Sequence, residues 1–173
     1  MSRSGTHLLV PRRLRRFLLR APRLFVTLWA PDDRELGELG EEIAARHLAS
    51  RGWRILGRRV RTRAGEADLV VRSGRVLAVV EVKTGRAAPI PRPRGAVLPE
   101  RFVLRWRPGA RCDAPRISRL RAVGREIGAD PQFSRHLPGR PARARVDLIE
   151  VLLEGPRRRF RVLHHEDLRE PLA

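Results

Sequence analysis

The sequence contains a single cysteine, Cys112, and neither tyrosine nor asparagine. One cysteine cannot build an internal disulfide framework, and it cannot build a zinc site of several cysteines. This cysteine content excludes a disulfide-stabilised small domain and is typical of the reducing cytoplasm, where we expect the protein to be. The sequence also lacks an apolar run of membrane-spanning length, so we expect no stable membrane insertion.

Lysine is the second scarce residue. The chain has 38 basic residues, and Lys83 is the one lysine among them. Arginine is a permanently charged planar fork, whereas lysine is a compact ammonium whose pKa responds to its surroundings. A compositional bias against lysine could leave one by chance. The acidic residues around Lys83 favour the other interpretation, which is that this position requires an ammonium group.

Acidic residues are outnumbered, and the formal net charge is +19. Such a positive field attracts polyanions, of which nucleic acid is the first candidate and an anionic membrane surface the second. Biased genome composition explains arginine in place of lysine, but it does not require an excess of bases over acids. We therefore expect nucleic acid, in the first place DNA, as the partner.

The length of 173 residues suits one domain with an extension. Residues 1–33 form a basic N-terminal extension in which arginines alternate with leucines, and we expect it to be poorly ordered. A helix lying on a membrane or on nucleic acid, and a targeting peptide, are the alternatives. Residues 34–173 form the main domain. Proline and arginine fill a segment at about 86–114, which we interpret as an insertion that includes a short strand near Trp106 and a basic flap.

The hydrophobic pattern of the main domain alternates between helix and strand periods. It predicts a helix, three strands, a second helix and two strands, which makes an α/β fold with a mixed β-sheet flanked by helices. Pro31-Asp32-Asp33 and Asp113-Ala114-Pro115 are the expected start signals of the two helices. The expected elements are a helix over 34–51, a strand over 53–60, a hairpin within 65–83, a helix over 113–128, a polar loop over 130–143, and strands over 145–153 and 159–164.

The hairpin carries the main chemical signal. With Ser73-Gly74 as a two-residue turn, Arg72 would pair with Arg75 and Glu66 with Glu81. Side chains alternate along a strand, so Glu66, Asp68, Glu81 and Lys83 would point to one side. Carboxylates gathered in this way repel one another. Either Lys83 or a divalent cation such as Mg²⁺ would offset the repulsion.

Further candidates lie on the neighbouring elements. Glu41 borders the buried side of the first helix, where an ordinary flanking role is the alternative. His164 and His165 are adjacent in a strand and would face opposite sides, so we interpret them as structural or surface residues. The arginines expected to contact phosphates follow the first predicted strand or lie on the second helix: Arg58, Arg59, Arg61, Arg63, Arg116 and Arg119.

The stretches Gly65-Glu66-Ala67-Asp68 and Glu81-Val82-Lys83 resemble the core of the PD-(D/E)XK nucleases. With Leu39-Gly40-Glu41, Gly52-Trp53-Arg54-Ile55 and Arg145-Val146-Asp147, they resemble more closely the bacterial YraN family, also called UPF0102. The resemblance covers about residues 36–168. Three positions depart from the family pattern: Arg59 stands where asparagine is usual, Arg116 stands where lysine is frequent, and the 86–114 insertion is long.

The resemblance implies a restriction-endonuclease-like fold, similar to archaeal Holliday-junction resolvases. It implies that Glu41, Asp68 and Glu81 hold Mg²⁺ or Mn²⁺ and that Lys83 positions or activates water. The hairpin geometry adds Glu66 as a supporting acid. The expected function is metal-dependent, structure-selective endonuclease cleavage of DNA, for example of recombination or repair intermediates. Similar resolvases are symmetric homodimers. The alternatives are a non-catalytic nucleic-acid-binding module and an accessory subunit that works with a helicase or recombination partner.

Overall fold

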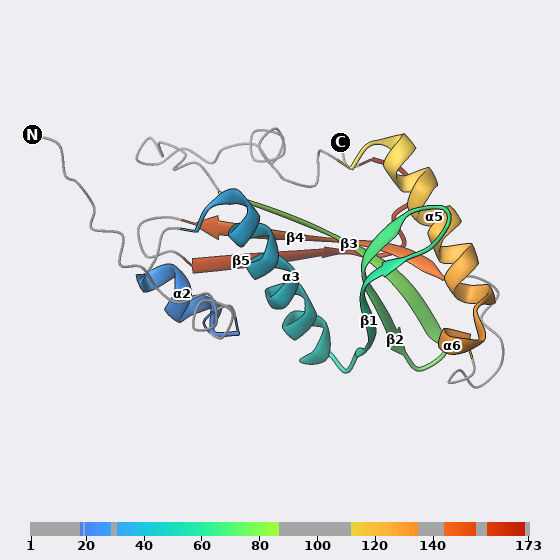
Figure 1. Ribbon diagram of the computed structural model, residues 1–173, viewed down its shortest axis with the longest axis horizontal. Helices are drawn as coiled ribbons and strands as arrows, with labels where there is room; N and C mark the ends of the chain where they lie inside the picture. The colour runs from blue at the N-terminus through green and yellow to red at the C-terminus, as the bar shows by residue number, and fades with distance from the viewer. Residues whose placement is uncertain are drawn as a thin grey trace, which may run out of the picture.

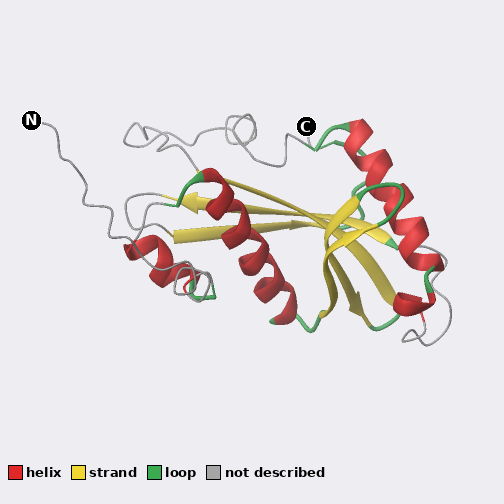
Figure 2. Cartoon of the chain, in the orientation of Figure 1, coloured by secondary structure: helices red, strands yellow, loops and turns green. Residues whose placement is uncertain are grey.

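The computed structural model describes residues 18, 20–28, 31–86, 112–134, 144–154 and 159–171. Its centre is a five-stranded mixed sheet in the order β1-β2-β3-β4-β5, with helices on both sides (Figures 1 and 2). The α/β fold with a mixed sheet flanked by helices is thus confirmed. The described elements are α2 (Pro22–Leu28), α3 (Asp33–Ala49), β1 (Arg54–Arg61), β2 (Glu66–Ser73), β3 (Val76–Arg86), α5 (Ala114–Ala129), α6 (Pro131–Ser134), β4 (Arg145–Glu154) and β5 (Arg159–His165).

Both long helices start where the sequence predicted. The side chain of Asp32 accepts a hydrogen bond from the backbone N–H of Glu35, and Glu35 reciprocates in a capping box. Asp113 caps α5 by accepting from the backbone N–H of Arg116, and Pro115 occupies the first turn. The caps satisfy N–H groups that have no partner within the helix, so they fix where each helix begins.

The sheet has a core on each face. On one face, Leu48 and other residues of α3 pack against Val80 and Ile149. On the other face, Leu120 and other residues of α5 pack against Val79 and Leu148. Because β3 and β4 are parallel, the chain needs a crossover between them, and α5 lies within that connection.

The turn of the β2–β3 hairpin differs from the prediction by one residue. Ser73 pairs with Val76, so the two-residue loop is Gly74-Arg75, and Gly74 has a positive φ of 54°. Glycine tolerates this conformation, which a tight hairpin turn requires at its first loop position. The register therefore moves by two residues from the predicted one. An even shift leaves every side chain on its predicted face.

Part of the N-terminal extension belongs to the folded body. Helix α2 buries Phe25 and Val26 against Leu36 and Leu39 of α3 and against Leu153 of β4. The apolar residues between the arginines thus have a packing role. Pro22–Leu28 is thus a packed helix within the predicted extension, and the division of the chain at residue 33 stays a prediction.

Several other expectations lie outside the described residues. Most of the predicted insertion, with Trp106 and the short strand, falls in 87–111. Of the predicted loop over 130–143, the part that is described forms the short helix α6, which buries Phe133. Among the described helices, none combines the length and the apolar character that crossing a membrane requires.

Candidate active site

Asp68 and Glu81 meet where the β2–β3 ladder ends. The final backbone pair at this end is Leu69 with Val80, and the next residue on each strand is one of the two acids. Past the end of this ladder, the Asp68 carboxylate accepts a hydrogen bond of 2.7 Å from the backbone N–H of Val82. The Asp68 side chain thus replaces a backbone carbonyl of β2 as the partner of this N–H, while β3 continues along β4. The predicted placement of both acids on one face is borne out by this geometry.

Glu81 is the most enclosed group of the site, with 1% exposure. Its Oε1 lies 2.6 Å from Lys83 Nζ, so the lysine points to the same face. Arg116 of α5 donates to both Glu81 oxygens, at 3.1 Å and 2.5 Å. The sequence predicted a positive group among these acids, and Lys83 is one. Arg116, predicted only as a phosphate contact, is the second.

The environment of Asp68 opposes its charge. Burial first, and then the negative charges of Glu81 and Glu41, raise its pKa from 3.8 to about 6 overall. The hydrogen bond from Val82 and the ammonium of Lys83 act in the opposite direction. A carboxyl group whose pKa is raised by burial and by a neighbouring carboxylate is typical of functional sites.

Glu41 lies on α3, and its carboxylate pairs with Arg59 of β1. Its two carboxylate oxygens each accept a hydrogen bond of 2.9 Å from Arg59. Its charge reaches Asp68, because it contributes to the raised pKa of that residue. Among the described residues, no three His, Cys, Asp or Glu side chains form a group that could hold a metal. The structure therefore brings together two of the three predicted metal ligands.

Two backbone features set the position of Glu41 and its partner. A Cβ built on Gly40 would lie 1.8 Å from Thr84 Oγ1, so only glycine allows α3 to cross β3 so closely. Arg59 has a positive φ of 49°. Asparagine adopts this conformation more readily than arginine. The backbone conformation at residue 59 therefore suits asparagine better than the arginine that this chain has there.

Five of the six predicted phosphate-binding arginines are exposed, Arg116 is half-buried, and several of the six form ion pairs with acidic side chains. Arg61 pairs with Glu66 at 2.7 Å, which also places the predicted supporting acid in an ion pair. Arg58 pairs with Glu42 at 3.2 Å. The arginine side chains in these pairs are 84% and 46% exposed. Exposed ion pairs of this kind are worth at most about 1 kcal/mol, so phosphates can compete for these arginines. Arg63 and Arg119 are also exposed.

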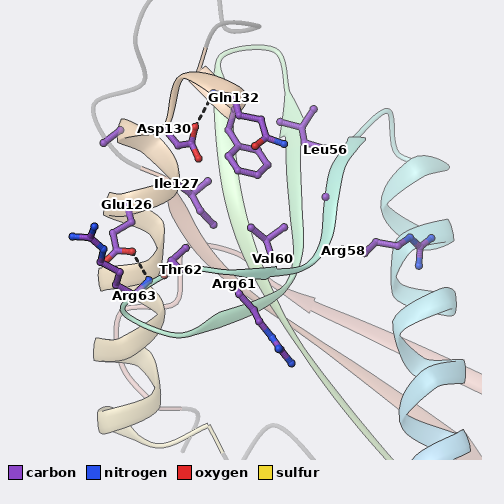
Figure 3. A pocket seen from close by; sticks show the side chains of 13 residues that line it. Leu56, Arg58, Val60, Arg61, Thr62, Arg63, Glu126, Ile127, Asp130 and Gln132 are labelled. Atoms are coloured by element: carbon purple, nitrogen blue, oxygen red, sulfur yellow. Dashed lines mark hydrogen bonds between the residues drawn. The ribbon is translucent and has the colours of Figure 1, made fainter.

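A groove of about 770 Å³ lies apart from these acids, between β1 and the end of α5. Its lining includes the apolar side chains of Leu56, Val60 and Ile127. Figure 3 shows Arg58 and Arg61 extending away from those side chains. None of Asp68, Glu81 and Lys83 lines the groove. We therefore place the candidate site at the acids and not in this groove.

Two further buried acids on β4 were not among the predicted site residues. Asp147 and Glu150 are both 0% exposed. Asp147 lies 2.9 Å from His164 Nε2, and Glu150 lies 2.8 Å from His165 Nε2. The histidines thus face opposite sides, as predicted, and each contacts a buried carboxylate. The signal was present in the sequence as two acids within the otherwise apolar run of residues 146–153.

Comparison with known proteins identifies relatives over most of the chain. The model of "Uncharacterised protein family UPF0102" matches residues 40–151. A UPF0102 protein of Streptomyces griseus is 37% identical over 130 residues, which is 75% of this chain and 91% of that relative. UPF0102 protein SCO5602 of Streptomyces coelicolor is 36% identical over 131 residues, which is 75% of this chain and 84% of the relative.

A shorter match has a higher sequence identity. A UPF0102 protein of Rhizorhabdus wittichii is 62% identical over 48 residues, which cover 28% of this chain and 41% of that relative. The family match contains Glu41, Asp68, Glu81, Lys83 and Arg116. On these matches, the chain belongs to the UPF0102 family.

Proposed function

We propose that this protein is a metal-dependent endonuclease of the PD-(D/E)XK type that hydrolyses phosphodiester bonds in DNA. The observation that carries the proposal is the convergence of Asp68, Glu81 and Lys83. Two acids from adjacent strands and the one lysine of the chain share one face. Burial, and after it the charge of Glu81, raise the pKa of Asp68, and a bound divalent cation would offset both effects by stabilising the ionised carboxylate.

The donor set fits Mg²⁺ or Mn²⁺ with two carboxylate ligands. Mg²⁺ commonly binds through one or two carboxylates and completes its shell with waters and substrate phosphates. Asp68 and Glu81 would hold the ion, and Glu41 would contribute at longer range through its charge. When bound, the ion would supply charge neutralisation on the phosphate and a more acidic water.

The chain's own residues have distinct roles in this proposal. Lys83 orients the attacking water and offsets the negative charge that grows on the phosphate in the transition state. Arg116 holds Glu81 in place through two hydrogen bonds. The exposed arginines of β1 and α5 bind the DNA backbone without reading its sequence, so binding should depend steeply on salt concentration. The protein would then recognise its substrate by DNA structure, for example that of recombination or repair intermediates.

A specific observation favours a second candidate, a nucleic-acid-binding module without catalysis. Both Glu81 oxygens already accept hydrogen bonds from cationic side chains. Two acids, Asp68 and Glu81, thus face two cations, Lys83 and Arg116, and this balance needs no metal. The same module could serve as the accessory subunit of a helicase or recombination complex.

A cleavage assay separates the two candidates. The substrates are single-stranded, duplex and four-way-junction DNA, each with Mg²⁺, with Mn²⁺ and with EDTA. We expect metal-dependent cleavage that is lost in Asp68→Ala and Lys83→Ala, while DNA binding persists. Glu42→Gln is the control, because Glu42 lies next to Glu41 on α3 and pairs with Arg46 and Arg58. Binding with no cleavage in any metal would contradict the endonuclease and support the module.

A further inference from the structure

The face that carries Glu81 and Lys83 continues across β4 and β5. Lys83 pairs with Glu150 in the parallel ladder. Leu148 pairs with Glu81 on one side and with His165 on the other. Residues that pair across a ladder project to the same face of the sheet. Glu150 and His165 therefore lie on the same face as Lys83.

Glu150 is an unusual residue for this position. It is 0% exposed, and the side chain of its neighbour His165 is 23% exposed. An enclosed carboxylate costs several kcal/mol unless nearby groups compensate it. Glu150 is the backbone partner of Lys83 in the parallel ladder, and adjacent strands lie about 4.8 Å apart, so the two side chains start next to each other on this face. His165 compensates the carboxylate from the other side, with Nε2 lying 2.8 Å from Oε1.

We propose that Glu150 and His165 are positioning residues for Lys83. Glu150 provides a second negative charge for the ammonium, on the strand next to the one that carries Glu81. His165 fixes the orientation of the Glu150 carboxylate and connects it to the protein surface. The consequence for catalysis rests on the proposed nuclease function, whereas the positioning of Lys83 does not.

The opposite face of the sheet offers a matched control. Asp147 and His164 form a pair of the same chemistry, at 2.9 Å, with Asp147 also 0% exposed. Their surroundings are structural: His164 makes edge contacts with Trp53 and His47, and Arg145 pairs with Asp147. Disrupting this pair tests the effect of losing a buried acid–histidine contact away from Lys83.

The lone lysine makes the test direct. Protein produced with ¹³C-labelled lysine has one Hε–Cε signal, since Lys83 is the only lysine. We expect His165→Leu and Glu150→Gln to move this signal by more than its line width. His164→Leu and Asp147→Asn should leave it in place. His165→Gln, whose amide can still donate to Glu150, should return the signal toward the wild-type position.

The proposal is overturned if His165→Leu leaves the signal unchanged, or if His164→Leu moves it as far. His165→Leu decides the question even if Glu150→Gln does not fold, because His165 is partly exposed. The measurement needs neither metal nor DNA, so its outcome is independent of the proposed nuclease function. If cleavage is also observed, His165→Leu should lower kcat about tenfold with little change in KM.

Discussion

Arg116 and Glu81 form a two-pronged ion pair across 35 positions of sequence, with hydrogen bonds of 3.1 Å and 2.5 Å. The pair joins α5 to β3 at the point where β3 separates from β2. It ties the position of a candidate metal ligand to the helix that covers it. Glu81 is almost fully enclosed, so losing the arginine would leave its charge with less compensation.

Removing the Arg116 side chain should lower the stability of the fold. We expect Arg116→Gln to lower the free energy of unfolding by about 2 kcal/mol, because it leaves an enclosed carboxylate with one cation fewer. Chemical denaturation measures this difference. Arg119→Gln, one turn further along α5 and exposed, is the control and should change stability by less than about 0.5 kcal/mol. Equal effects of the two variants would contradict the assigned role of Arg116.

Asp68 should make the protein less stable at high pH. Its pKa is raised from 3.8 to about 6, so the folded state binds this proton more tightly than the unfolded state does. The stabilisation from that proton is present below pH 4 and is lost as the pH rises through 6. Asp68→Asn removes the charge and keeps an acceptor for the Val82 N–H. We expect this variant to exceed wild type by about 2 kcal/mol at pH 8.

The advantage of Asp68→Asn should shrink as the pH falls below 6, which denaturation curves at several pH values would measure. Glu66→Gln, on the same strand, is the control, because Glu66 forms an ion pair with a largely exposed arginine. A loss of stability in Asp68→Asn at pH 8 would contradict the prediction. A gain would mean that the wild-type protein keeps a destabilising acid, as expected for a functional residue.

Two glycines of α3 should respond oppositely to the same substitution. Gly40→Ala should lower the free energy of unfolding by about 2 kcal/mol, because the new Cβ overlaps Thr84. Gly37 has nothing within 4 Å of a built Cβ, so Gly37→Ala should stabilise by about 0.5–1 kcal/mol through helix propensity. Thermal denaturation measures both. Adding Thr84→Ala to Gly40→Ala should recover part of the loss, and the absence of any recovery would argue against the predicted clash.

Helix α2 should contribute to the stability of the whole domain. Phe25 is 0% exposed and Leu24 is 49% exposed, although the two are adjacent. We expect Phe25→Ala to cost about 3 kcal/mol and Leu24→Ala less than about 0.5 kcal/mol. Denaturation of the full chain measures both values. Near-equal costs would mean that α2 does not pack on α3 in solution.

Much of the fold followed from local patterns. The helix starts at Asp32 and Asp113, the order of helices and strands, and the opposite faces of His164 and His165 depend on capping and on periods of 3.6 and 2 residues. The turn was misplaced by one residue. Both Ser73-Gly74 and Gly74-Arg75 satisfy turn chemistry, and the pairing of the strands decided between them.

The sequence by itself determined that Asp68, Glu81 and Lys83 share a face, because alternation along adjacent strands requires it. Only the tertiary structure decided which cation holds Glu81, that Glu41 binds Arg59, and that Glu150 lies beside Lys83. Those relationships join elements that are distant in the chain. They depend on how α3, α5 and β4 pack on the sheet, and no local propensity encodes that packing.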